Sequence, residues 1–394
     1  MDASDVGTVP RARKGWHALA YLSLGHFFID FYSNVLGVFA PLLQQQFHLN
    51  LTQIGFLGGF LSFSSSLTQP LYGYLFDRWR SPLFATLAPG VAGIFLASLG
   101  MAPSFGWLVP FVFLGGAGIA SFHPAGTSRV AVGLTPEKRQ KAMAVFISSG
   151  TLGLACGPSF FSFLLDQVGL AHAYLGAIPG VLTSVIMLTL LPKSDAATQT
   201  ENKTKFDLAP LKAVWRPLTV LYFCVFLRSV IQISFSALLP LYLNRERGYT
   251  LSSASHVLSA YLTAGALGGF IGGNLANRFG GKRVIQASFL GCVPLLALFF
   301  FTSGWISMVG FILGGLMLLF TVPVNVVMAQ ELVPSQAGTV SALMMGASWG
   351  MAGLISIPLV GWAGDHYSLQ TALSSLLIAP VIGFFLTLLL RSKY

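Results

Sequence analysis

GYLFDRW at residues 73–79 recurs as GNLANRF at residues 273–279, and this repetition is the feature of the sequence that decides the fold. The two copies lie 200 residues apart, and three pairs of prolines keep nearly the same spacing. These pairs are Pro41 with Pro240, Pro124 with Pro323, and Pro158 with Pro358. One recurring offset at four places along the chain indicates an internal duplication. We therefore expect two halves of similar structure.

The composition is that of a membrane protein. Of 394 residues, 54% are hydrophobic and 9% are charged, with a mean hydropathy of +0.74. A soluble domain has about a quarter charged residues, so this chain has too few charges to cover a surface that faces water. Its 43 glycines favour the same class, because glycine lets helices approach closely in lipid. The sequence predicts an all-α polytopic protein embedded in a lipid bilayer.

The net charge of +10 does not indicate a nucleic-acid partner, because the basic residues form short clusters between apolar runs and are typical of topology signals. Cys156, Cys224 and Cys292 lie far apart within apolar runs, without the spacing of a zinc site or a disulfide framework. No glycine-rich phosphate-binding motif ending in Gly-Lys-Ser or Gly-Lys-Thr indicates ATP binding. We expect no metal and no cofactor.

Apolar runs of about 20 residues, the length needed to span a bilayer, occur twelve times. Their ranges are about 16–44, 53–76, 82–102, 105–131, 139–165, 170–191, 215–243, 252–277, 283–302, 305–332, 337–363 and 368–390. The first run is too long for a cleaved signal sequence and contains Asp30, so we interpret it as a span. The polar stretch 193–214 divides the chain into an N-terminal six-helix bundle (1–192), a cytoplasmic linker (193–214) and a C-terminal six-helix bundle (215–394).

The distribution of basic residues predicts the orientation. Arginine and lysine clusters precede span one, follow spans two, four and eight, surround the linker and end the chain, all on one side. The opposite side has Arg245 and Arg247. Because cytoplasmic loops are enriched in basic residues, we expect both termini in the cytoplasm and a location in the bacterial inner membrane, the plasma membrane of the cell.

Twelve spans, the duplication and a motif after spans two and eight resemble the major facilitator superfamily, over nearly the whole chain. The family motif is Gly-x-x-x-Asp-Arg-x-Gly followed by basic residues. The two copies keep these positions: Gly73, Asp77 and Arg78, and then Gly273 and Arg278. The first copy lacks the second glycine, and the second copy has Asn277 in place of the acid. The resemblance implies two pseudo-symmetric six-helix bundles and a monomer. It also implies that the motif loop gates the inner end, with a weaker gating role for the second copy of the motif.

Span five contains Gly153-x-x-x-Gly157-Pro158, which resembles the antiporter motif of drug/proton exporters but lacks its trailing glycine pair. The small residues permit close packing, and the proline kinks the helix. A closer resemblance than that of the antiporter motif is carried by GIASFHPAGTSRVA at residues 118–131, which resembles the fosmidomycin resistance protein branch. That resemblance implies a proton-driven exporter of a small polar or amphipathic compound or drug.

Polar residues within the spans are the candidate transport residues, because an ionisable side chain in a membrane helix usually faces a cavity. His26, Asp30 and Asn34 follow one another at four-residue spacing and share one helical face. Arg228 lies at nearly the same depth in span seven, with Gln232 one turn further. We predict that Asp30 and Arg228 form an ion pair that protons or substrate switch; the alternative is a permanent pair that fixes packing.

Span four adds His123, before Pro124, and Arg129 near the inner end. Because histidine as a residue type titrates near neutral pH, His123 either relays protons or packs as a core histidine. Arg129 either belongs to the transport path or anchors the inner end as a topology signal.

Three functions remain open at this point. The first is a proton-coupled exporter that works by alternating access. An uptake symporter, or a transporter of lipids, siderophores or other metabolites, has the same fold. A membrane-embedded acyltransferase would use His26 and Asp30 as a general-base pair, but the pair has no partnered nucleophile. We therefore predict no catalytic residues and no enzyme.

Overall fold

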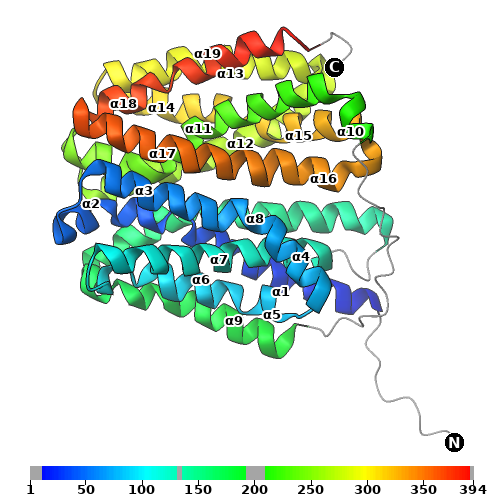
Figure 1. Cartoon of the computed structure of the whole chain (residues 1–394), viewed down its shortest axis with the longest axis horizontal. Coiled ribbons are helices and arrows are strands. Elements are labelled where there is room, and N and C mark those ends of the chain that lie inside the picture. The colour runs from blue at the N-terminus through cyan, green and yellow to red at the C-terminus, as the bar shows by residue number, and fades with distance from the viewer. Residues whose placement is uncertain (1–10, 131–134, 192–208, 391–394) are drawn as a thin grey trace, which may run out of the picture.

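The computed structural model describes residues 11–130, 135–191 and 209–390, which form helices joined by short turns (Figure 1). Up to residue 191 the helices are α1 (Arg11–Tyr32), α2 (Val35–Phe47), α3 (Leu51–Ser62), the π-helical turn η1 (Phe63–Leu67), α4 (Gln69–Trp79), α5 (Leu83–Thr86), α6 (Ala88–Ala97), the 3-10 turn η2 (Leu99–Met101), α7 (Phe105–Val130), α8 (Pro136–Val168), the 3-10 segment η3 (Leu170–Ala177) and α9 (Ile178–Leu190).

From residue 209 onward the helices are α10 (Ala209–Ala213), α11 (Trp215–Arg245), α12 (Leu251–Phe279), α13 (Gly281–Phe301), α14 (Gly304–Leu318), α15 (Thr321–Leu332), the 3-10 turn η5 (Pro334–Gln336), α16 (Ala337–Ser341), the π-helical turn η6 (Ala342–Ala347), α17 (Ser348–His366), α18 (Leu369–Ser375) and α19 (Ile378–Thr387). The predicted linker 193–214 falls mostly outside the described residues, and α10 occupies part of its end. The exact domain boundaries therefore stay a prediction.

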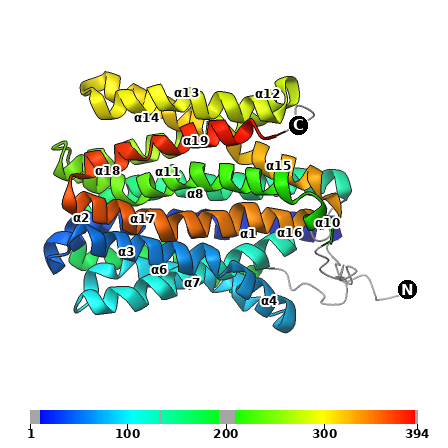
Figure 2. The ribbon, with the colours of Figure 1, turned by 45° about the horizontal axis from the view of Figure 1, so that its top comes forward.

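The long helices run side by side along the longest axis, with the first half of the chain below the second half in Figure 1. In the rotated view of Figure 2, α3, α4, α6 and α7 again lie below the second half, whereas α8 overlaps α11 and α17. The starts of α1 and α10 and the end of α19 lie at one end of the bundle, which we name the proximal end. The opposite end, with the start of α3 and the end of α17, is named the distal end.

Ten helices of the described chain are long and apolar enough to cross a membrane. They correspond to spans one and four to twelve of the sequence prediction. The two other predicted spans, 53–76 and 82–102, are also helical but divided into shorter pieces. In 53–76, the serine-rich π-helical turn η1 separates α3 from α4, while in 82–102 the apolar helical part is Leu83–Ala97.

The duplication predicted from sequence recurs in contacts. A Cβ added at Gly73 of α4 would lie 3.6 Å from Cβ of Pro124, and one added at Gly273 of α12 would lie 3.8 Å from Cγ of Pro323. The helix starts repeat as well: Asn50 caps α3 and Thr250, 200 residues later, caps α12. Each side chain accepts a hydrogen bond from the backbone N–H three residues on, which satisfies an otherwise unpaired donor.

The two halves pack against each other through α3 with α17, α2 with α11, and α8 with α12. A Cβ added at Gly55 of α3 would lie 2.7 Å from the backbone oxygen of Ile357, so glycine is required for this approach. At the distal end, the carboxylate of Asp365 accepts hydrogen bonds from the backbone N–H groups of Leu51 and Thr52, each at 2.8 Å. The distal end is therefore closed across the two halves.

Candidate functional site

Asp30 and His26 lie on one face of α1, close to the point where this helix ends at Tyr32. A turn at Ser33 and Asn34 separates α1 from α2, so the continuous helical face predicted for His26, Asp30 and Asn34 is interrupted. Both ends of that face nevertheless point to α8. Nδ1 of His26 lies 2.7 Å from the backbone oxygen of Phe146, and Nδ2 of Asn34 donates to that of Leu154 at 3.4 Å.

The ring of His26 is held in one orientation. It stacks on the ring of Phe146, with centroids 4.2 Å apart, and on that of Phe122 at 5.9 Å. A carbonyl oxygen accepts hydrogen bonds, so the contact with Phe146 requires a proton on Nδ1 of His26. The other nitrogen, Nε2, is thereby directed to Asp30 and carries no proton in the neutral ring.

Asp30 lies between two histidines. Its Oδ2 is 3.4 Å from Nε2 of His26, and its Oδ1 is 3.7 Å from Nε2 of His123 on α7. The side chains of Asp30 and His123 are 20% and 25% exposed, whereas that of His26 is 9% exposed. The sequence named all three residues as candidates, and the structure brings them together.

Small residues on α8 make room for this cluster. A Cβ added at Gly150 would lie 2.5 Å from Oδ2 of Asp30 and 2.6 Å from Nε2 of His26. Additional Cβ atoms at Gly153 and Gly157 would overlap the backbone oxygens of Phe27 and Phe31. The antiporter-like motif therefore allows α8 to lie directly against α1, and α8 continues as one helix through Pro158.

Sequence reasoning missed Gly150 and the backbone carbonyl of Phe146. Gly150 precedes Gly153 by one helical turn, so the small-residue spacing on α8 was a usable signal for it. Nothing in the identity of Phe146 indicated that its carbonyl would hold a histidine ring, because that contact depends on the packing of α1 against α8.

The predicted ion pair between Asp30 and Arg228 is wrong for this structure. Among the residues that it describes, the ion-pair partners of Asp30 are the two histidines. The guanidinium of Arg228 instead donates to Oε1 of Gln232 and lies 4.8 Å from the ring centroid of Trp349 on α17. Equal depth in repeat-related helices was not sufficient to predict an ion pair, because depth does not fix the direction in which each side chain points.

The other predicted residues lie away from this cluster. Arg129 is buried in the last turn of α7. Near the end of α4, Asp77 is exposed and Nη1 of Arg78 donates to the hydroxyl of Tyr74 at 3.4 Å. Arg278, at the end of α12, lies 5.1 Å from the ring centroid of Phe279. The gating role predicted for these two motif copies stays a prediction.

The ligand atoms of His26, Asp30 and His123 lie within 4.8 Å of one another. By residue type, two imidazoles and a carboxylate suit a transition metal as well as a proton. The sequence predicted no metal, and that stays a prediction.

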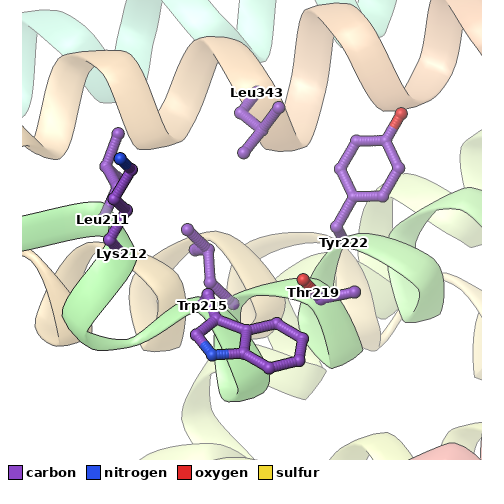
Figure 3. A pocket seen from close by; sticks show the side chains of 7 residues that line it. Leu211, Lys212, Trp215, Thr219, Tyr222 and Leu343 are labelled. Carbon is purple, nitrogen blue, oxygen red and sulfur yellow. The ribbon is translucent and has the colours of Figure 1, made fainter. Parts of the chain in front are cut away.

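A separate cavity of about 380 Å³ lies near the proximal end of α11 (Figure 3). It is lined by Leu211, Lys212, Trp215, Leu218, Thr219, Tyr222 and Leu343. In Figure 3, Leu343 of η6 faces the α10–α11 residues across the opening. The lining is mainly apolar, so this cavity suits an apolar group, with Lys212 as its charged residue.

Comparisons with known proteins agree on one family. A sequence profile described as Major Facilitator Superfamily matches residues 22–345 and 221–393. The fosmidomycin resistance protein of Escherichia coli (strain K12) is 28% identical over 97% of this chain and 94% of its own length. An uncharacterised MFS-type transporter, YfnC of Bacillus subtilis (strain 168), is 30% identical over 94% of this chain and 92% of its own length.

Solved structures show the same fold. A bacterial homologue of the human lysosomal transporter Spinster, in an inward-facing and occupied conformation, matches with a TM-score of 0.79 and 18% identity over 97% of both chains. The nucleoside transporter NupG matches with a TM-score of 0.75 and 15% identity, over 95% of this chain and 98% of its own. This chain belongs to the Major Facilitator Superfamily of membrane transporters.

Proposed function

We propose that this secondary transporter is a proton-coupled antiporter that exports a small polar or amphipathic compound, and that Asp30, His26 and His123 bind the coupling proton. The single observation that carries the proposal is the arrangement of His26. Its Nδ1–H donates a hydrogen bond to the backbone oxygen of Phe146. In the neutral ring the lone pair of Nε2 therefore faces Oδ2 of Asp30, 3.4 Å away.

Two acceptors that face each other repel unless a proton lies on one of them. The contact therefore favours one bound proton, either on His26 as an imidazolium beside a carboxylate or on Asp30 as a carboxylic acid. His123 lies 3.7 Å from the other carboxylate oxygen and is more exposed than His26. It provides a second imidazole through which a proton reaches or leaves Asp30.

The fold supplies the conformational half of the mechanism. In alternating access, two bundles rock around a central site so that it opens to one side at a time. Here the halves meet at the distal end through Asp365 and the glycines of α3. We place the proximal end, which carries the basic helix ends, the start of α1 and the end of α19, in the cytoplasm of a bacterial cell. This structure then corresponds to a state closed to the outside.

The direction of transport is supported by two observations. The relative in Escherichia coli is named for resistance to fosmidomycin, and resistance by a transporter requires export. The glycines of the antiporter-like motif hold α8 against α1 at the proposed proton site, so movement between these helices would change the surroundings of Asp30.

Transport by purified protein in proteoliposomes tests the proposal. A panel of compounds that includes fosmidomycin is first screened by thermal shift, because a ligand of the native state stabilises it. Uptake of a binding compound is then measured with and without an imposed pH gradient, in a buffer that contains a metal chelator. We expect gradient-driven exchange in the wild type and its loss in Asp30→Asn.

Asp166→Asn is the matched control, because Asp166 is an exposed acid near the end of α8. It should keep full exchange. Full activity of Asp30→Asn would contradict the proton site, and abolition of wild-type transport by the chelator would assign the cluster to a metal. Uptake that proceeds in the same direction as proton flow would indicate a symporter.

A further inference from the structure

Arg228 carries a buried charge that no acidic residue of the described part of the chain neutralises. It lies in the middle of α11 and is 1% exposed. Its two assigned partners, the amide oxygen of Gln232 and the ring of Trp349, are uncharged. None of the acidic side chains in the described part of the chain forms an ion pair with it.

This arrangement is strongly unfavourable without a further partner. A guanidinium stays protonated in proteins, and a buried charge is normally paired and fully hydrogen-bonded. The cation–π contact and the one amide oxygen satisfy only part of the five N–H donors of the Arg228 guanidinium. Its Nε donates to no acceptor in the residues that the structure describes. The charge balance of the site lacks one anion.

Other buried polar atoms without partners come from the helices around Arg228. They are the hydroxyls of Ser229, Ser255, Tyr261 and Ser348 and both side-chain polar atoms of Asn325, counted within the described ranges. These residues belong to α11 and to α12, α15 and α17, all of which pack against α11. The phenol of Tyr261 interacts electrostatically with the guanidinium. Buried polar atoms are rarely unpaired, so the phenol of Tyr261 beside this charge is a further group that a bound ligand would satisfy.

We propose that Arg228 binds an anionic group of the transported compound, a carboxylate, phosphonate or phosphate. The inference rests on the proposed transport of a small compound and adds its chemical class. A guanidinium offers two parallel N–H donors that match the oxygens of such groups. Gln232 and Trp349 hold the guanidinium in place, and the hydroxyl of Tyr261, which interacts electrostatically with it, supplies a further donor.

Aromatic acids are suitable probes. Trp349 presents a ring beside the guanidinium. The apolar cavity lies between the same two segments, α11 and η6–α17. Its lining residue Tyr222 lies six residues before Arg228, and Leu343 lies six residues before Trp349. Six helical residues correspond to about 9 Å. Phenylphosphonate and benzoate carry an anionic head on an apolar ring, and benzamide is an uncharged compound of similar shape.

The experiment measures thermal unfolding of the purified full chain in detergent at constant ionic strength, with each probe titrated and no pH gradient present. We expect saturable increases in Tm with phenylphosphonate and benzoate and none with benzamide. The increases should vanish in Arg228→Gln and persist in Arg245→Gln, which removes an exposed arginine from the distal end of the same helix. Arg228→Lys should respond, but at higher probe concentrations, because it keeps the charge without the planar fork.

A second readout separates binding from a purely structural role. Without probe, Arg228→Gln should unfold at the same or a higher temperature than the wild type, because the substitution removes an unpaired buried charge. A lower Tm in Arg228→Gln, together with no response of the wild type to either anion, would overturn the inference. So would equal responses in wild type and Arg228→Gln.

Failure of this inference can be told apart from failure of the proposed function. Exchange that depends on Asp30 and on a pH gradient, in a protein without anion binding, would overturn the anion site alone. Anion binding at Arg228 in a protein whose transport ignores the pH gradient would overturn proton coupling alone.

Discussion

Replacing Asp365 with alanine should shift the transporter away from its distally closed state. The carboxylate of Asp365, at the end of α17, accepts hydrogen bonds from the first two backbone N–H groups of α3 at 2.8 Å and from the hydroxyl of Thr52 at 2.6 Å. These bonds join the two halves of the chain, and they place a negative charge at the positive end of a helix. Asp365 therefore stabilises the state in which the halves touch at this end.

The size of the effect follows from the loss of a helix cap, which costs about 0.5–2 kcal/mol. Since every 1.4 kcal/mol is a tenfold change in an equilibrium constant, Asp365→Ala should favour distal opening by about 2- to 30-fold. Asp365 is exposed at the surface, so salt should weaken its contribution in the wild type.

The assay is a distance distribution between spin labels on cysteines placed at Gln45 of α2 and His256 of α12, both exposed and near the distal end. Cys156 is exposed and must first be replaced, whereas Cys224 and Cys292 are buried. The longer-distance population should grow in Asp365→Ala.

Glu246→Ala is the matched control. The carboxylate of Glu246 accepts hydrogen bonds from the backbone N–H groups of Leu369 and Gln370 at 2.7 and 2.9 Å, so it caps α18 in the same way. This contact lies within the second half, and its loss should lower stability without changing the label distances. Identical distance distributions in the two variants would refute the reasoning.

Two further predictions concern packing around α1. Gly150→Ala should push Asp30 and His26 apart and reduce gradient-driven exchange, with little change in Tm because the added methyl meets only side-chain ends. Its control is Gly157→Ala, in which the added methyl would meet the main chain of α1. That control should lose about 1–3 kcal/mol of stability. If both variants lose equal stability and keep exchange, the proposed role of Gly150 is wrong. The hydroxyl of Tyr32 donates to one backbone group and accepts from another, each at 2.9 Å, so Tyr32→Phe should lower the free energy of unfolding by about 1–3 kcal/mol. Denaturant unfolding in detergent checks this value, and an unchanged stability would show that the two backbone groups find other partners.

The sequence by itself determined the class, the repeat and most of the candidate residues. Low charge and long apolar runs require a membrane, because such a chain cannot cover a water-facing surface. The 200-residue offset predicted two halves of similar structure, and the approach of Gly73 to Pro124 recurs as that of Gly273 to Pro323. The cost of a carboxylate in an apolar helix singled out Asp30 before any contact was known.

Tertiary structure alone decided which partners these residues have. Repeat symmetry placed Asp30 and Arg228 at similar depth, but depth does not fix helix rotation or the distance between helices. The packing of α1 against α7 and α8 gives Asp30 two histidines, and Arg228 has no anionic partner among the residues that the structure describes. The contact of Asp365 with Thr52 spans 313 residues, and a contact at that separation depends on how the two halves dock, which local sequence patterns do not record.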